Sequence, residues 1–164
     1  MIQEKIKWKG RERIISWDTT LPPPELVTQV SGICFTNDGL IVVIAEDDGV
    51  WKLPGGKPDP YETLEQTFIR ETWEEACAVV EECVFIGAQR IDDPNHPQGL
   101  TPRYQVRFWA RVRLDPFDPQ FETLYRVEIK PELMILTLSW DAKRVLQAII
   151  DSALEEEARH TSIN

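Results

Sequence analysis

Three glutamates lie close together near the middle of the chain, at positions 71, 74 and 75. On an α-helix, spacings of three and four residues place them on one side within about one turn. At about 100° per residue, Leu64, Thr67 and Phe68 occupy the same arc. The acidic side chains therefore continue an apolar stripe, whereas a solvated acidic face would lie opposite it. Because enclosed carboxylates are strongly unfavourable without a counter-charge, the pattern predicts a divalent-cation site suited to pyrophosphate chemistry.

The residues before this helix suit the same purpose. Trp51 to Gly56, with the sequence WKLPGG, ends in a glycine pair that lets backbone atoms approach a metal or phosphate closely. Two helix starts fit the sequence. Asp59 could cap a helix that has proline at its first position, and Thr63 with Gln66 forms an equally good capping box. Either alternative predicts a helix that begins between residues 60 and 64.

The whole segment 56–78 resembles the Nudix box, G-x5-E-x7-R-E-U-x-E-E-x-G-U, in which U is a bulky aliphatic residue. The matching positions are Gly56, Glu62, Arg70, Glu71, Glu74 and Glu75. Three positions depart from the pattern, because Thr72, Cys77 and Ala78 replace an aliphatic residue, a glycine and an aliphatic residue. In the family that glycine ends the helix in a left-handed conformation, which is disfavoured for other residues by roughly 1 kcal/mol. We therefore expect the helix to run slightly past its usual end.

The resemblance implies a Nudix hydrolase that cleaves a diphosphate linkage in a nucleoside diphosphate linked to another moiety, such as a nucleotide or a nucleotide sugar. It also implies a Mg²⁺ cofactor, with Mn²⁺ as an alternative ion. By resemblance, the metal ligands are Glu71, Glu74, Glu75 and the Gly56 carbonyl. Arg70 orients carboxylates, so that Arg70, Glu71 and Glu74 form the catalytic set, and Glu62 supports the box.

Two questions stay open at the level of sequence. The base that deprotonates water lies in the box of some family members and in a later loop of others, for which Glu122 is the best-placed acidic residue, ahead of Asp115 and Asp118. The chain could also be a Nudix-fold module that senses a nucleotide without turnover. Such modules typically lose box carboxylates, and all of them are retained here, which favours the enzyme.

Composition is consistent with one Nudix domain over residues 1–164. The net charge of -10 argues against stable nucleic-acid binding and favours a small nucleotide-type substrate that arrives chelated to a metal. The three cysteines form no CxxC pair, which argues against a structural zinc site or disulfide framework. No transmembrane-length apolar run and no secretory signal are evident, so we expect a cytoplasmic protein without membrane association. A homodimer is left open, because six tryptophans need no partner.

The remaining pattern predicts an α/β fold, and the resemblance specifies an α/β/α sandwich around a mixed β-sheet. Strands are expected at 27–36, 40–46, 78–90, 103–113 and 125–130, with a hairpin turn at Asp38-Gly39 and a helix at 140–158. The strand at 103–113 has one apolar face and one largely cationic face. The cationic face is either solvated or supplies substrate-binding arginines, with Arg103 and Arg107 as the candidates. The acidic run Glu155–Glu157 is expected to be solvated.

Overall fold

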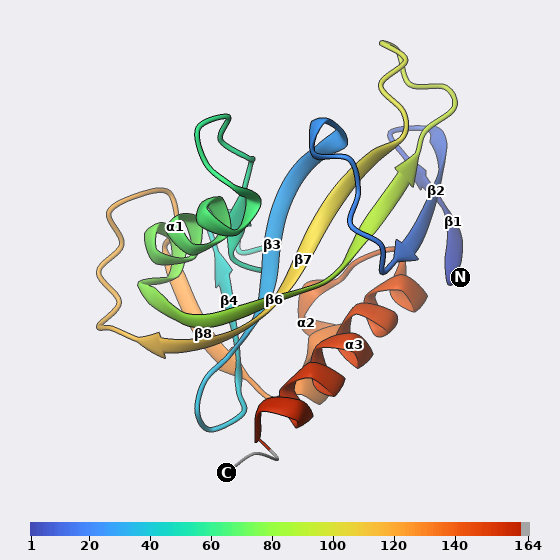
Figure 1. Ribbon diagram of the computed structural model, residues 1–164. Helices are drawn as coiled ribbons and strands as arrows, with labels where there is room; N and C mark the ends of the chain where they lie inside the picture. The colour runs from blue at the N-terminus through green and yellow to red at the C-terminus, as the bar shows by residue number, and fades with distance from the viewer. Residues whose placement is uncertain (162–164) are drawn as a thin grey trace.

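The computed structural model describes residues 1–161, which form a mixed β-sheet with helices on both faces (Figure 1). The sheet order is β1-β2-β6-β7-β3-β4-β8, and the short β5 pairs with β3. β3 and β7 run parallel, whereas the other neighbouring strands are antiparallel. The predicted α/β class and the sandwich around a mixed sheet are confirmed.

The strand and helix bounds agree with the predicted ones to within a few residues. The predicted strands are β3 (Val27–Phe35), β4 (Ile41–Ala45), β6 (Ala78–Asp92), β7 (Arg103–Leu114) and β8 (Tyr125–Ile129), and the predicted helices are α1 (Leu64–Ala76) and α3 (Lys143–Thr161). Four elements were not predicted: β1 (Gln3–Trp8), β2 (Arg11–Asp18), β5 (Gly55–Gly56) and α2 (Met134–Leu138). Short 3-10 turns at Pro24–Leu26 and Pro131–Leu133 complete the chain.

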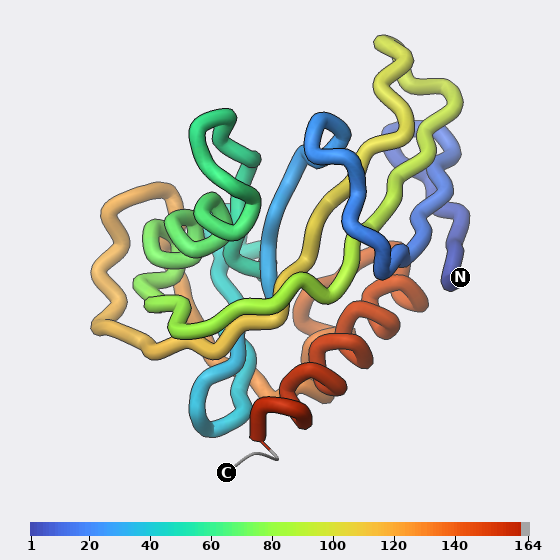
Figure 2. Tube along the Cα trace, viewed as in Figure 1, coloured from blue at the N-terminus to red at the C-terminus, as the bar shows by residue number. Residues whose placement is uncertain are grey.

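β1 and β2 form a hairpin that extends the sheet beyond β6. The carboxylate of Asp93, which is fully buried, accepts hydrogen bonds from Arg11 at 2.9 Å and from Arg13 at 3.1 Å. These contacts tie β2 to the loop that follows β6. In Figure 2 this loop projects beside the hairpin at the far end of β6 and β7.

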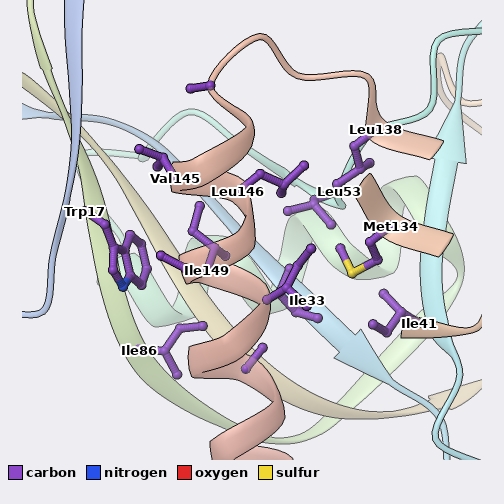
Figure 3. Packing of buried hydrophobic residues seen from close by; sticks show 14 of the residues in the cluster. Trp17, Ile33, Ile41, Leu53, Ile86, Met134, Leu138, Val145, Leu146 and Ile149 are labelled. Atoms are coloured by element: carbon purple, nitrogen blue, oxygen red, sulfur yellow. The ribbon is translucent and has the colours of Figure 1, made fainter. Parts of the chain in front are cut away.

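The larger apolar cluster lies between the sheet and the helices α2 and α3 (Figure 3). Ile33 and Ile41 from the sheet meet Met134 from α2 and Leu146 and Ile149 from α3, and all five side chains are fully buried. A second cluster lies on the opposite face, where Phe68 of α1 stacks on Phe108 of β7 with ring centroids 5.0 Å apart. The sheet thus separates the α1 face from the α3 face.

β7 has the two faces that its alternation predicts. Tyr104, Val106, Phe108, Ala110 and Val112 are buried in the α1-side cluster. The opposite face is not simply solvated, because α3 covers it: Trp109 is fully buried and Arg107 is only 2% exposed. The solvated interpretation of this face is therefore wrong for its central residues.

The C-terminal acidic run also differs from expectation at two positions, because the side chains of Glu156 and Glu157 are only 13% and 12% exposed. Glu157 accepts hydrogen bonds from the indole nitrogen of Trp109 at 3.1 Å and from Arg111 at 2.5 Å. These contacts fasten the last turns of α3 to β7. Glu157 is thus a docking residue, since its helical position brings it to the covered face of the sheet.

Candidate active site

Helix α1 begins at a complete capping box. The side chain of Thr63 accepts a hydrogen bond from the Gln66 backbone N–H at 3.1 Å, and the side chain of Gln66 accepts one from the Thr63 backbone N–H at 2.9 Å. The start at Leu64 therefore decides between the two alternatives in favour of Thr63. Because the cap fixes where the first turn begins, it also fixes the direction of each glutamate further along the helix.

The helix ends at Ala76, and Cys77 adopts the left-handed conformation with φ 51° and ψ 37°. The Cys77 N–H donates to the Trp73 carbonyl at 2.9 Å, and its Sγ lies 3.6 Å from the Asp118 carbonyl oxygen. The expectation that the helix runs past its usual end is therefore wrong. A left-handed C-terminal residue satisfies backbone groups of the last turn, and this outweighs the conformational cost.

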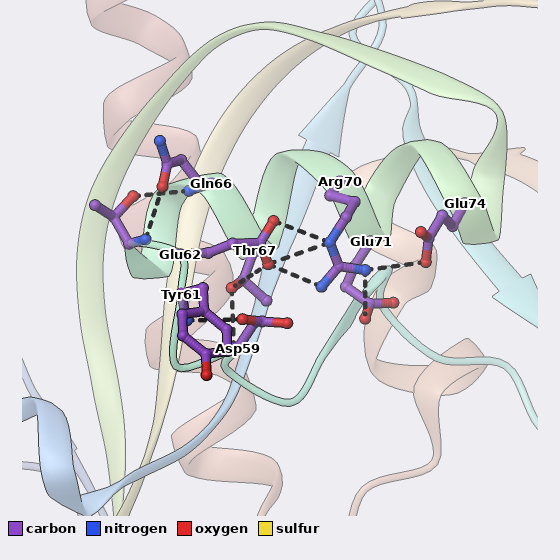
Figure 4. A network of polar contacts seen from close by, with 9 residues as sticks. Asp59, Tyr61, Glu62, Gln66, Thr67, Arg70, Glu71 and Glu74 are labelled. Atoms are coloured by element: carbon purple, nitrogen blue, oxygen red, sulfur yellow. Dashed lines mark hydrogen bonds and ion pairs between the residues drawn. The ribbon is translucent and has the colours of Figure 1, made fainter.

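Arg70 holds the carboxylates of the box together (Figure 4). One edge of its guanidinium donates to Glu62, with Nε–Oε2 at 3.0 Å and Nη2–Oε1 at 2.9 Å. Its Nη1 donates to Glu74 at 3.1 Å and to Glu71 at 3.3 Å. The hydrogen bonds from Arg70 lower the pKa of Glu62. A planar fork suits this role because it can bind several carboxylate oxygens in fixed directions.

Glu75 lies on the other side of the cluster. Its Oε1 accepts the Gly55 backbone N–H at 2.8 Å, which links α1 to the glycine pair. Burial raises the pKa of Glu75 to about 7, although the Gly55 N–H and the nearby Lys52 oppose that rise. Burial also raises the pKa of Glu71. The carboxylates are thus partly withdrawn from water, as the continuation of the apolar stripe predicts.

Gly56 is in close contact with Glu71. A Cβ atom at position 56 would lie 2.5 Å from Glu71 Cδ and 2.7 Å from its Oε1. Because real Cβ contacts are longer, the Glu71 carboxylate would have to move. Glycine at this position therefore keeps Glu71 close to the backbone of the glycine loop.

We expect Gly56→Ala to lower kcat about tenfold or more, because catalytic groups displaced by about 1 Å cost up to 10²-fold. The melting temperature should change by only a few degrees, since the end of the Glu71 side chain can move. Steady-state kinetics and thermal unfolding of the same preparation check this. Unchanged kcat in a folded variant would show that the contact does not position Glu71.

A hollow of about 280 Å³ opens beside these glutamates. Its lining consists of Glu71, Glu74, Glu75, Phe121, Glu122 and Thr123. The last three belong to the connection between β7 and β8, which passes beside α1 (Figure 2). The structure therefore brings Glu122 to the box, as the later-loop alternative requires. Phe121 and Thr123 were not singled out, because a loop carries no periodicity that shows which side chains face a site.

The two candidate substrate-binding arginines lie away from this hollow. Arg103 is half-buried and lines a separate depression of about 310 Å³ with Thr28 and the residues 99–102. Arg107 points to the α3 face of the sheet, where glutamine side chains surround it. Their contact with substrate phosphates stays a prediction.

A sequence model of the NUDIX domain matches residues 26–146, which include the box, the sheet strands β3 to β8 and the start of α3. The chain belongs to the Nudix family. A MutT-like protein of Streptomyces ambofaciens is 40% identical over 65 residues, which span 39% of this chain and 42% of that relative. The family predicted from the box is thus confirmed.

Solved Nudix structures share the fold. A mutant form of the pyrophosphohydrolase BsRppH of Bacillus subtilis superposes with a TM-score of 0.72 at 20% identity and covers 96% of this chain and 98% of that one. The NUDIX domain of Shewanella oneidensis NrtR, complexed with ADP ribose, gives 0.60 at 21% identity over 82% and 93%. An ADP-ribose pyrophosphatase of Streptococcus suis gives 0.56 at 21% identity over 80% and 90%. No helix within residues 1–161 is long and apolar enough to cross a membrane.

Proposed function

We propose that this Nudix chain hydrolyses the diphosphate linkage of a nucleoside diphosphate linked to another moiety, with Mg²⁺ as cofactor and Mn²⁺ as an alternative. The observation that carries the proposal is the hollow lined by the partly buried side chains of Glu71, Glu74 and Glu75. Burial raises the pKa of two of these groups, Glu71 and Glu75. Carboxylates that water solvates poorly need a cation, and hard divalent cations prefer oxygen ligands.

The donor set fits such an ion, although no three His, Cys, Asp or Glu side chains of residues 1–161 already converge as ligands. Hydrogen bonds from Arg70 hold Glu71 and Glu74, and the Gly55 N–H holds Glu75. We propose that the three carboxylates, with the Gly56 carbonyl, would hold the metal. When bound, the ion would neutralise phosphoryl charge and lower the pKa of attacking water.

The remaining roles belong to the protein itself. Arg70 keeps Glu71 and Glu74 oriented and offsets their mutual repulsion, while Glu62 fixes Arg70 from the other side. We assign Glu122 to take the proton from the attacking water, because it lines the same hollow from a separate loop. A base outside the metal-binding set can accept that proton without giving up its hold on the metal.

If Glu122 is the base, Glu122→Gln should lower kcat by about 10²-fold and leave KM within about threefold, as is typical for the loss of general-base catalysis. Glu128→Gln removes a charge from β8 outside the hollow and serves as the control. A Glu122→Gln enzyme within threefold of wild type in kcat would place the base in the box.

The test of the proposed function is monophosphate release, after coupling to a phosphatase, from a panel of nucleotides and nucleotide sugars with Mg²⁺. We expect wild type to turn over at least one member, and Glu74→Gln to turn over that member at least about 10²-fold more slowly. Nucleotide binding without turnover of any member would contradict the hydrolase and favour a sensing module. The solved neighbours are too distant to choose a panel member, since identities near 20% support the fold only.

A further inference from the structure

Three glutamines form a row across three adjacent strands on the α3 face of the sheet. Gln105 of β7 is the register partner of Gln29 in β3 and of Gln89 in β6. Side chains paired in this way have Cβ atoms about 5 Å apart and point to the same face. Arg107 stands two residues along β7, on that face. Its guanidinium donates to the side-chain oxygens of Gln29 at 3.3 Å, Gln105 at 2.8 Å and Gln89 at 2.5 Å.

Arg107 is a buried cation without a carboxylate partner among residues 1–161. Within the part of the chain that the structure describes, it otherwise donates only to the Val106 carbonyl, and its Nε has no partner. The ring of Trp140 lies 5.4 Å from its Cζ atom. Burial lowers the pKa of Arg107 to about 9, so the group still carries its charge at neutral pH. A protein with a well-packed apolar residue in place of a buried ionic group is often equally stable. The buried cation therefore points to a role beyond stability.

Arg107 determines which way the glutamine amides point. A guanidinium has only donors, so each amide must present its oxygen to Arg107 and direct its NH₂ group elsewhere. Gln89 and Gln105 both line a groove of about 430 Å³. No described residue accepts a hydrogen bond from either amide nitrogen, and neither nitrogen is a buried atom without a partner. Both NH₂ groups therefore stay available as donors, and the groove is a hollow that both glutamines line.

The groove is suited to a flat ring. Trp51 and Trp140 line it from two different connections, and Trp8 of the N-terminal hairpin completes the aromatic lining. Aromatic side chains with a few fixed polar groups are the usual lining of a small-molecule site.

The groove is separate from the hollow beside the box, but Lys52 links the two regions. Lys52 lines the groove and lies close enough to oppose the rise in the pKa of Glu75. Gly56 is four positions further along the chain, a reach of at most about 14 Å for an extended chain. A nucleoside ring in the groove would thus place its diphosphate towards the carboxylates.

We propose that Arg107 locks the amides of Gln89 and Gln105 as a pair of donors, and that this pair selects a nucleoside with a 6-oxopurine ring over one with adenine. The inference rests on the proposed function and names its substrate class. Guanine presents two neighbouring acceptors, O6 and N7, whereas adenine presents an acceptor beside the N6 donor. Two amide donors match both acceptors of guanine. With adenine, one amide donor would face the N6 donor. Arg107 is therefore a positioning residue, which differs from the direct phosphate contact expected from the sequence.

The test compares the binding of GDP, IDP and ADP to wild type by calorimetry, with Ca²⁺ in place of Mg²⁺. We expect GDP and IDP to bind with similar affinity and at least about tenfold more tightly than ADP, the lower range for a paired base contact. IDP lacks the 2-amino group of GDP, so equal binding assigns recognition to the O6 and N7 edge. ADP binding as tight as GDP, or no binding of any of the three, would overturn the inference.

Two variants separate positioning from folding. Arg107→Met should weaken the binding of GDP about tenfold and the binding of ADP less than twofold, because the amides can rotate once Arg107 is absent. Gln89→Glu exchanges a donor for an acceptor and should reverse the preference towards ADP. The ratio of the GDP affinity to the ADP affinity does not change when part of the protein is unfolded. Arg111→Met, on the same strand and face but outside the groove, should leave the ratio unchanged. Equal weakening of GDP and ADP by Arg107→Met would show a purely structural role and overturn the proposal.

The binding and turnover experiments can refute the proposed selectivity and the proposed hydrolase independently of each other. A preference for GDP and IDP without hydrolysis of any guanosine or inosine panel member would refute the hydrolase and retain the groove's selectivity. Hydrolysis of the panel with adenosine compounds preferred would retain the hydrolase and refute the groove.

Discussion

Replacing Glu74 with glutamine is expected to reduce kcat by about 10²- to 10⁴-fold, since charge stabilisation by a bound cation is worth several kcal/mol and each 1.4 kcal/mol is tenfold. Glu74 accepts a hydrogen bond from Arg70 at 3.1 Å and lines the hollow beside α1. Glutamine keeps the size of the side chain and one acceptor oxygen, so Arg70 retains a partner. The loss should therefore appear as weakened binding of the metal and slower chemistry in a folded protein.

Glu65→Gln is the matched control, because Glu65 is an exposed residue on the first turn of the same helix and lies outside the hollow. It makes the same change in charge and should leave kcat within about twofold, as surface substitutions usually do. Kinetics over a range of Mg²⁺ concentrations should show a raised metal requirement for Glu74→Gln only. Similar losses in both variants would indicate a general effect of charge on α1 rather than a metal site.

Glu75→Gln is expected to reduce activity about 10²-fold or more and, in the absence of metal, to stabilise the protein above neutral pH. Burial raises the pKa of Glu75 to about 7 from the ordinary 4.5. The folded state therefore prefers the protonated carboxyl. Its contribution to stability is fully present below pH 4.5 and is lost as the pH rises towards 7. Glutamine is neutral throughout and can still accept the Gly55 N–H.

Denaturant unfolding with EDTA checks the sign of this effect. The free energy of unfolding of Glu75→Gln, relative to wild type, should rise between pH 5 and pH 8 by on the order of 1–3 kcal/mol. Mg²⁺ should stabilise wild type more at pH 8 than at pH 5 and should have little effect on the variant. A relative stability that stays flat or falls between these pH values would mean that the folded protein does not disfavour the charged Glu75 carboxylate, and the interpretation of a partly enclosed cluster would fail.

The box could be predicted from the sequence because its information is local. A capping box sets the start of α1, and a spacing of three and four residues then determines which side chains share a face. The apolar stripe of Leu64, Thr67 and Phe68 predicted correctly that Glu71 and Glu75 are half-enclosed. The helix end was not predicted correctly, because a propensity argument omits the contacts that hold Cys77 in its left-handed conformation.

The groove on the α3 face could not be predicted, because it depends on pairing between distant strands. Gln29, Gln89 and Gln105 lie far apart in the sequence, and only the register of β3, β7 and β6 aligns them. The hairpin that contributes Trp8 was missed because the segment 1–18 mixes charged and apolar residues. Its position depends on Asp93, a long-range partner with no local signal.

The central claim is that the carboxylates of α1 hold a divalent cation that diphosphate cleavage requires. Its most direct test is the initial rate of monophosphate release from the best panel substrate, measured after EDTA treatment and during Mg²⁺ titration. We predict no turnover with EDTA, saturable recovery with Mg²⁺ in wild type, and a recovered rate at least about 10²-fold lower in Glu74→Gln at the same concentrations. Turnover that survives EDTA, or equal recovery in Glu74→Gln, would contradict the claim.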